Sequence, residues 1–132
     1  VYRRSTPVPT PIACAARAAL RVVTQEPGLL GTLRQNIDRL RAGLRTLGLR
    51  VHDLPIPIFT FVLDDAATMA GVHRALLQDG LYAPFIEYPG GPTPQFFRVT
   101  VTASHTAEQI DRLIAGFEAH LPRAARAQAA GV

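Results

Sequence analysis

The chain has 132 residues, of which 48% are hydrophobic and 18% are charged, and its formal net charge is +4. This length allows about one domain with a real core, and the composition is globular rather than disordered. The arginines are scattered with no dense basic run, so nucleic-acid binding is not expected. No apolar run approaches the roughly eighteen residues of a membrane span, and nothing resembles a signal peptide.

All fourteen residues of the Lys+Arg count are arginine, so the chain contains no lysine. The single cysteine, Cys14, excludes an internal disulfide and favours a reducing, cytoplasmic compartment. No metal site is expected, because the four histidines lack a metal-ligand spacing. The chain begins with Val1 rather than Met, which favours a processed piece, a truncated reading frame or one part of a longer protein.

Two helices are expected in the first third of the chain. The first begins near Pro9 to Pro11, because proline fits a first helical turn, and runs through an alanine-rich stretch to about Gln25. The second ends at Gly48 and carries apolar residues at helical spacing. Its stripe, predicted to face the core, consists of Leu30, Leu33, Ile37, Leu40, Leu44 and Leu47.

After Gly48 the apolar pattern changes to short runs typical of strands. Strands are expected at 49–52, 56–63, 81–86 and 96–102, with a Pro/Gly-rich loop at 87–95.

One further helix is expected between these strands, and another is expected after the last of them. Asp64-Asp65 can cap a helix from about Ala66 to Asp79. A capping box of Thr106 and Gln109 begins the last helix. The apolar stripe of that helix consists of Ile110, Leu113, Ile114, Phe117 and Leu121. The order of elements predicts an α+β domain in which helices cover one face of a small, mostly antiparallel sheet.

Arg98 is the one charge in the strand-like run 96–102. A guanidinium presents a planar fork of donors that matches a carboxylate in two parallel hydrogen bonds. Arg98 is therefore a candidate anion-binding residue at the lip of a cleft. The alternative is an edge-strand arginine that points at solvent or pairs with Glu87 or Glu108, and periodicity alone favours this alternative.

Two other places could contribute polar groups to a site. Ser5 and Thr6 precede a helix N-terminus, where hydroxyl and N–H groups can hold a phosphate, although a cap or turn is the simpler interpretation. His105 lies at a corner between a strand and a helix, where a buried hydrogen-bonding role is commoner than acid–base catalysis.

The two ends of the chain resemble landmarks of one enzyme family. The segment 5–13 is similar to a Ser-Thr-Ser-Leu-Pro-Pro segment leading into an alanine-rich helix. The segment 97–106 is similar to a hydrophobic-Arg-hydrophobic strand that ends in Ala-Ala-His-Thr. From about Tyr2 to Leu121, the chain thus resembles the C-terminal part of the α-oxoamine synthases, which are pyridoxal-phosphate-dependent acyltransferases of fold-type I.

The resemblance implies a role for each matching residue. Arg98 would bind the carboxylate of an amino acid that is condensed with an acyl thioester of CoA or a carrier protein. Thr6, and with it Ser5, would approach the cofactor phosphate across a homodimer interface. The Schiff-base lysine lies upstream in the family and is absent here, so the chain itself is expected to contain no catalytic residue and to be inactive alone.

The same resemblance implies a division of the chain. Residues 1–27 would form a cofactor and interface segment with an interdomain helix, residues 28–122 the small C-terminal α+β domain, and residues 123–132 a flexible tail. Departures from the family pattern, such as Pro7 after Ser-Thr, leave alternatives open. These are an aminotransferase of class I/II and a non-catalytic stand-alone module derived from the small domain.

Overall fold

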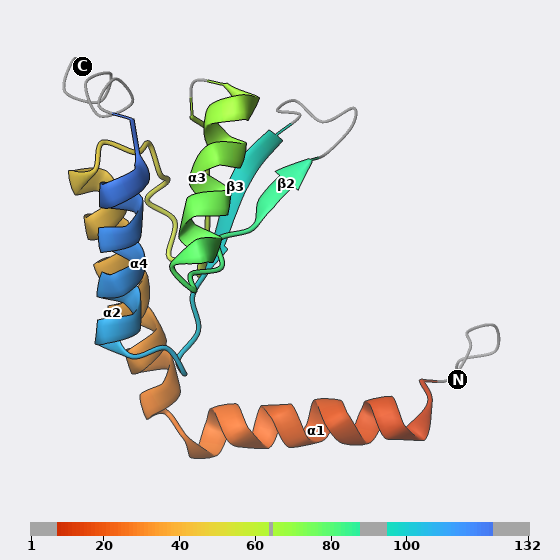
Figure 1. The fold of residues 1–132 in the computed structure, drawn as a ribbon. Helices are drawn as coiled ribbons and strands as arrows, with labels where there is room; N and C mark the ends of the chain where they lie inside the picture. The colour runs from red at the N-terminus through yellow and green to blue at the C-terminus, as the bar shows by residue number, and fades with distance from the viewer. Residues whose placement is uncertain (1–7, 64, 88–94, 123–132) are drawn as a thin grey trace.

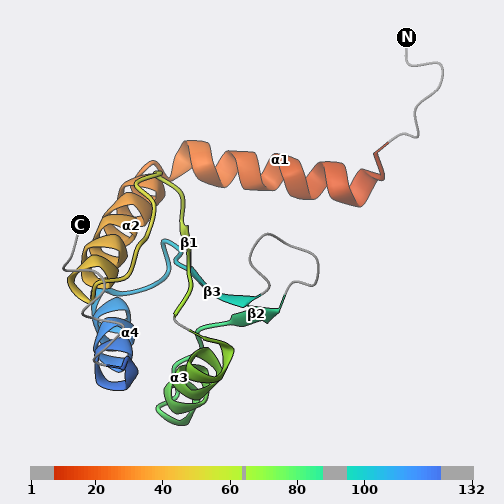
Figure 2. The ribbon, with the colours of Figure 1, turned by 90° about the horizontal axis from the view of Figure 1, so that it is seen from above.

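The computed structural model describes residues 8–63, 65–87 and 95–122. These residues form α1 (Thr10–Gln25), α2 (Gly28–Thr46), β1 (Ile58–Phe61), α3 (Ala66–Gln78), β2 (Phe85–Glu87), β3 (Gln95–Thr100) and α4 (Ala107–His120). Helices α2, α3 and α4 lie on one side of the sheet (Figures 1 and 2). The sequence-based prediction of an α+β domain with a small antiparallel sheet is confirmed.

The sheet has the order β1-β3-β2, and both pairings are antiparallel. Strand β3 is therefore the central strand of the described sheet, and Arg98 lies within it. Its cross-strand partner in β1 is Thr60.

Side chains alternate across the sheet between the core and the opposite face. Phe59, Phe61, Phe97 and Val99 are buried, and the residues between them in β1 and β3 are exposed. The rings of Phe61 and Phe97 also pack against Phe117 of α4, with centroids 5.5 and 5.6 Å away. The core thus fills the space between the helices and one sheet face, and the other face is open among the described residues.

Helices α2 and α4 pack closely and are joined by an ion pair. A Cβ atom at Gly43 of α2 would collide with the side chain of Ile114, so a glycine is needed for this approach. Arg39 Nε donates to Asp111 Oδ1 at 2.6 Å, and this hydrogen bond is the main reason that the pKa of Asp111 lies below its usual value.

The helix boundaries follow the local chemistry that the sequence indicates. The Asp65 side chain accepts the backbone N–H of Thr68 at the start of α3, and Thr106 and Gln109 form a reciprocal capping box at the start of α4. Gly80, which follows α3, has a φ of 73°, a left-handed conformation that favours glycine.

Several predicted boundaries were wrong. Residues 49–52 form no strand, β1 and β3 are shorter than expected, and β2 begins at Phe85 instead of Leu81. Leu30, predicted to be in the core, has 47% of its surface exposed. Most of the predicted 87–95 loop lies outside the described residues.

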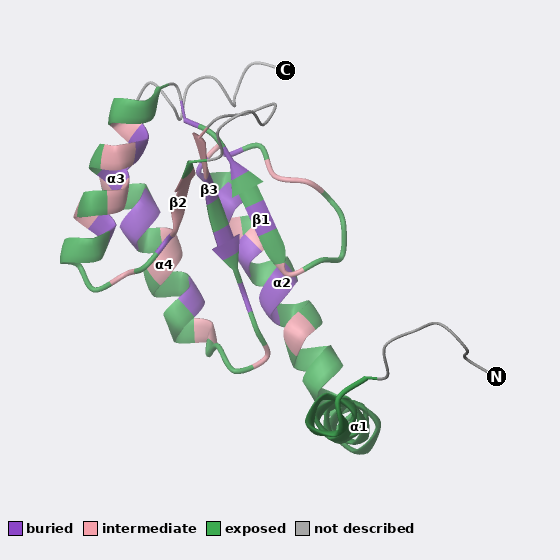
Figure 3. Ribbon diagram, turned by 90° about the vertical axis from the view of Figure 1, so that its right-hand side faces the viewer, coloured by how far each residue is buried: buried purple, intermediate pink, exposed green. Residues whose placement is uncertain are grey.

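Helix α1 contributes no buried residue. It extends away from the other elements (Figure 1), and Figure 3 shows it exposed along its whole length. Its apolar residues nevertheless recur at helical spacing, with Ile12, Ala16 and Val23 along one side and Arg17 and Arg21 on the other. None of the helices within the described ranges is long and apolar enough to cross a membrane.

Candidate functional site

Arg98 lies on the open face of the sheet, in its central strand. Its side chain is exposed, and it makes no hydrogen bond or ion pair with any residue in the described part of the chain. Of the two carboxylates considered as partners, Glu87 accepts a hydrogen bond from Gln95 Nε2 at 3.0 Å. Glu108 belongs to the first turn of α4. The guanidinium fork is therefore available to an anion.

Backbone hydrogen bonds show how Arg98 is held. The Arg98 N–H donates to the carbonyl of Pro84 at 3.0 Å, on the β2 side of the strand. The Val101 N–H donates to the carbonyl of Pro57 at 3.0 Å, on the β1 side. Since backbone groups alternate along a strand, Arg98 and Thr60 form a pair without mutual backbone hydrogen bonds. Side chains of such pairs lie closest, with Cα atoms about 4.5 Å apart.

The residues around Arg98 on this face are of two kinds. Polar side chains lie at the centre, where Thr60 faces Arg98 across the strands and Thr100 follows two positions along β3. Apolar side chains border them: Ile58 and Val62 are 39% and 49% exposed. One cation with a hydroxyl opposite it and an apolar border suits a small ligand that combines a carboxylate with an apolar part.

The strand-to-helix corner after β3 is fixed by Asn36 of α2. Its side-chain amide donates to the carbonyls of Thr102 and His105 at 2.9 and 2.8 Å, and Asn36 itself is only 6% exposed. The Thr102 N–H donates to His105 Nδ1 at 2.9 Å, which requires Nδ1 to be unprotonated. His105 thus has the hydrogen-bonding role expected at this corner, although it is exposed rather than buried.

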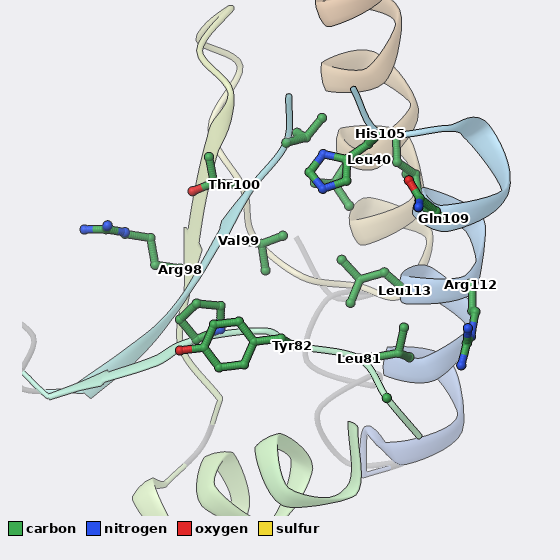
Figure 4. A pocket seen from close by; sticks show the side chains of 14 residues that line it. Leu40, Leu81, Tyr82, Arg98, Val99, Thr100, His105, Gln109, Arg112 and Leu113 are labelled. Atoms are coloured by element: carbon green, nitrogen blue, oxygen red, sulfur yellow. The ribbon is translucent and has the colours of Figure 1, made fainter. Parts of the chain in front are cut away.

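A cavity of about 550 Å³ lies between β3, α4 and the segment 80–84. Leu81, Val99 and Leu113 give it an apolar interior, and His105 and Arg112 lie at its border. Arg98 belongs to the lining, but Figure 4 shows its guanidinium pointing away from the cavity, toward the same side as the Thr100 hydroxyl. The cavity and the guanidinium are therefore separate features.

Sequence reasoning identified Arg98 but missed Thr60, which faces it, and Asn36, which fixes the corner after its strand. Asn36 lies three residues after Leu33 and four before Leu40, so the helical spacing already placed it on the inner face of α2. Thr60 is the polar residue in an alternating strand pattern, which signals the open face. Ser5 and Thr6 lie outside the described residues. Among the described residues, no three His, Cys, Asp or Glu side chains form a cluster that could hold a metal.

Comparison with known proteins adds to this geometry. Residues 1–117 match the family model of class I and II aminotransferases. The 8-amino-7-oxononanoate synthase of Thioalkalivibrio sulfidiphilus is 39% identical over 86% of this chain and 29% of its own length. The synthase of the same name from Methylococcus capsulatus is 35% identical over 94% of this chain and 32% of its own length.

Solved structures similar to this chain include a lysine-to-alanine variant of a serine palmitoyltransferase from S. paucimobilis with a bound PLP–myriocin aldimine. It is 28% identical to this chain, with a TM-score of 0.61 over 77% of this chain and 25% of its own.

The chain belongs to the class I and II aminotransferase family, and its structural neighbours are fold-type I pyridoxal-phosphate enzymes. Within this class it is a member of the α-oxoamine synthases, as the two sequence landmarks indicate. It spans about a third or less of the length of these curated relatives.

The residues of this chain do not by themselves make a pyridoxal phosphate site. Covalent attachment of the cofactor aldehyde requires a lysine amine, and the chain has none. Among the described residues of the strands, Arg98 is the only basic one on the open sheet face. Its guanidinium suits the carboxylate of a substrate.

Proposed function

We propose that this chain is the C-terminal part of a pyridoxal-phosphate-dependent acyltransferase of the α-oxoamine synthase type. The complete enzyme would join an amino acid to the acyl group of a CoA or carrier-protein thioester. The observation that carries the proposal is the exposed guanidinium of Arg98, without a partner among the described residues, at the polar centre of an open sheet face. The synthase relatives support it, since they match nearly the whole chain.

The open surfaces of the chain support its being part of a larger body. Figure 3 looks onto the open sheet face and shows α1 end-on, so α1 projects from the same side of the molecule as that face. The chain also spans only about a third of its relatives. We assign residues 1–27 to the interface with the missing part, residues 28–122 to the small domain and residues 123–132 to a tail.

In the complete enzyme, Arg98 would fix the orientation of the substrate. Two parallel hydrogen bonds from one guanidinium hold a carboxylate in a plane, which restricts rotation of the amino acid about its α carbon. The cofactor, when bound, supplies an electron sink that stabilises negative charge at that carbon. Its Schiff-base lysine would come from outside this chain, with Thr6 and Ser5 as proposed contacts to its phosphate across a homodimer interface.

Replacing Arg98 in the full-length enzyme tests the proposal. We expect Arg98→Ala to raise the KM for the amino acid by about a hundredfold, corresponding to a loss of about 3 kcal/mol for a charge-assisted pair. Arg98→Lys should restore the charge but only part of the affinity, because an ammonium lacks the planar fork. The KM for the acyl thioester should change much less. An unchanged amino-acid KM in both variants would remove Arg98 from the site.

The second substrate decides between the synthase and the alternatives. Steady-state assays with the amino acid and either an acyl thioester or a 2-oxo acid should show turnover with the thioester. Turnover with the 2-oxo acid alone would establish an aminotransferase, which would use Arg98 in the same way. Absence of turnover with both would favour the non-catalytic module.

A further inference from the structure

We propose that Thr60 is a second binding residue for the carboxylate that Arg98 holds, donating a hydrogen bond from its hydroxyl. This inference rests on the proposed function and deepens it, because it names a residue that helps to determine the specificity of the same site. It starts from the register of β1 and β3, which places Thr60 directly opposite Arg98.

The pairing type brings the two side chains together. The Arg98 N–H is bonded to Pro84 on the far side of the strand, so Thr60 and Arg98 exchange no backbone hydrogen bonds. Directly opposed Cβ atoms are about 4.5–5.5 Å apart, at the short end for pairs of this type. Both side chains project from the open face. When the Arg98 side chain lies along the sheet toward β1, a ligand oxygen bound to its guanidinium comes within reach of the Thr60 hydroxyl.

The chemistry of a carboxylate makes a second donor useful. A carboxylate has about four lone-pair positions, and a bidentate arginine uses two of them. A hydroxyl beside the guanidinium can donate to one of the remaining positions. The Thr60 hydroxyl makes no hydrogen bond with any described residue, so nothing in that part of the chain competes for it.

Thr100 provides a matched comparison on the same face. It also carries an exposed hydroxyl near Arg98 (Figure 4), but its cross-strand partner is Ile58. It lies two residues along β3 from Arg98, which is about 7 Å at the usual rise of a strand. The distance along the strand exceeds the distance across it, so the geometry selects Thr60 as the donor.

The test uses the full-length enzyme with Thr60→Val, Thr60→Ser and Thr100→Val. Valine keeps the shape of threonine and removes the hydroxyl, whereas serine keeps the hydroxyl. We expect Thr60→Val to raise the amino-acid KM about tenfold, the size of one hydrogen bond to a charged group, with kcat within about twofold. Thr60→Ser and Thr100→Val should both stay within about twofold of the parent KM.

A binding measurement without turnover separates this role from effects on the reaction. The dissociation constant of propanoate, measured by NMR titration, should rise about tenfold in Thr60→Val, whereas weak binding of the neutral propanamide should be unaffected. Circular dichroism checks folding, and Thr60→Ala replaces Thr60→Val if the valine variant is misfolded.

The outcomes distinguish the two proposals. An unchanged propanoate affinity in Thr60→Val or Thr60→Ala, together with weakened binding in Arg98→Ala, would overturn the role of Thr60 and leave the proposed function intact. An equal loss in Thr100→Val would also overturn it, since the effect would not be specific to the residue opposite Arg98. Unchanged binding in Arg98→Ala would contradict the proposed function itself.

Discussion

At the scale of single residues, the position of Arg98 in the sheet determines what its side chain can do. An arginine at a sheet edge is free to bend toward solvent or toward a nearby carboxylate. In the central strand of the described sheet, the side chain of Arg98 is directed to one face, and the residues beside it there are hydroxyl-bearing or apolar. This surrounding, rather than the arginine alone, makes a carboxylate the expected ligand.

Asn36 is the residue on which the corner after β3 depends. Replacing it by alanine leaves the carbonyls of Thr102 and His105 without their donor, which should lower the free energy of unfolding by about 2–3 kcal/mol. Urea denaturation of the chain measures this loss. The neighbouring Gln35→Ala, at an exposed position of the same helix, is the control and should change stability by less than about 0.5 kcal/mol. Equal effects of the two substitutions would show that the corner does not need Asn36.

At the scale of elements, a strand ends where the backbone can no longer form hydrogen bonds with the neighbouring strand. Pro84 has no N–H to return to Arg98, so the ladder between β2 and β3 stops there and the predicted strand 81–86 begins late. Residues 49–52 were predicted to form a strand, but a side chain, not a neighbouring strand, bonds to the backbone there. Arg45 donates to the Val51 carbonyl at 3.1 Å, and Leu49 is buried in the core. The apolar residues of this segment therefore pack against the core although the segment belongs to no sheet.

The cap of α3 gives a prediction about pH. Hydrogen bonds from the backbone and side chain of Thr68 lower the pKa of the Asp65 carboxyl from 3.8. Because the pKa is lowered in the folded state, the charged cap stabilises the protein at pH values above the ordinary pKa of an aspartate. That contribution is lost as the pH falls through the lowered pKa. We therefore expect Asp65→Asn to destabilise the chain at pH 7 and to have little effect near pH 2.

Urea denaturation of the parent chain and Asp65→Asn at several pH values checks this expectation. Thr68→Val, which removes one of the two donors to the carboxylate, should show a smaller difference of the same sign. A difference between parent and Asp65→Asn that does not vary with pH would contradict a charged cap.

At the scale of the whole molecule, α1 and the open sheet face are the surfaces that the described residues leave uncovered. A helix of 16 residues is marginal in water without tertiary packing, and α1 buries no residue here. Its apolar side includes Ile12 and Leu20, which are 61% and 67% exposed. Both surfaces would be covered if, as proposed, this chain is part of a longer enzyme whose other residues pack against them.

Deleting residues 1–27 tests how separate α1 is from the small domain. We expect the shortened chain to keep a cooperative urea transition within about 1 kcal/mol of the complete chain, because the deleted residues that are described contribute nothing to the core. Far-ultraviolet circular dichroism should show the loss of helix. A loss of cooperative unfolding would show instead that this segment is needed for the core to form.

The sequence by itself determined the helices, their caps, the α+β class and the choice of Arg98, because periodicity, turn residues and family landmarks are local. It also established that the chain has no lysine for a cofactor. Only the tertiary structure decided which strand is central, that Thr60 faces Arg98, and that Asn36 secures the corner after β3. These facts depend on strand order and register, which join residues distant in the chain and leave no local signal of which partner is chosen.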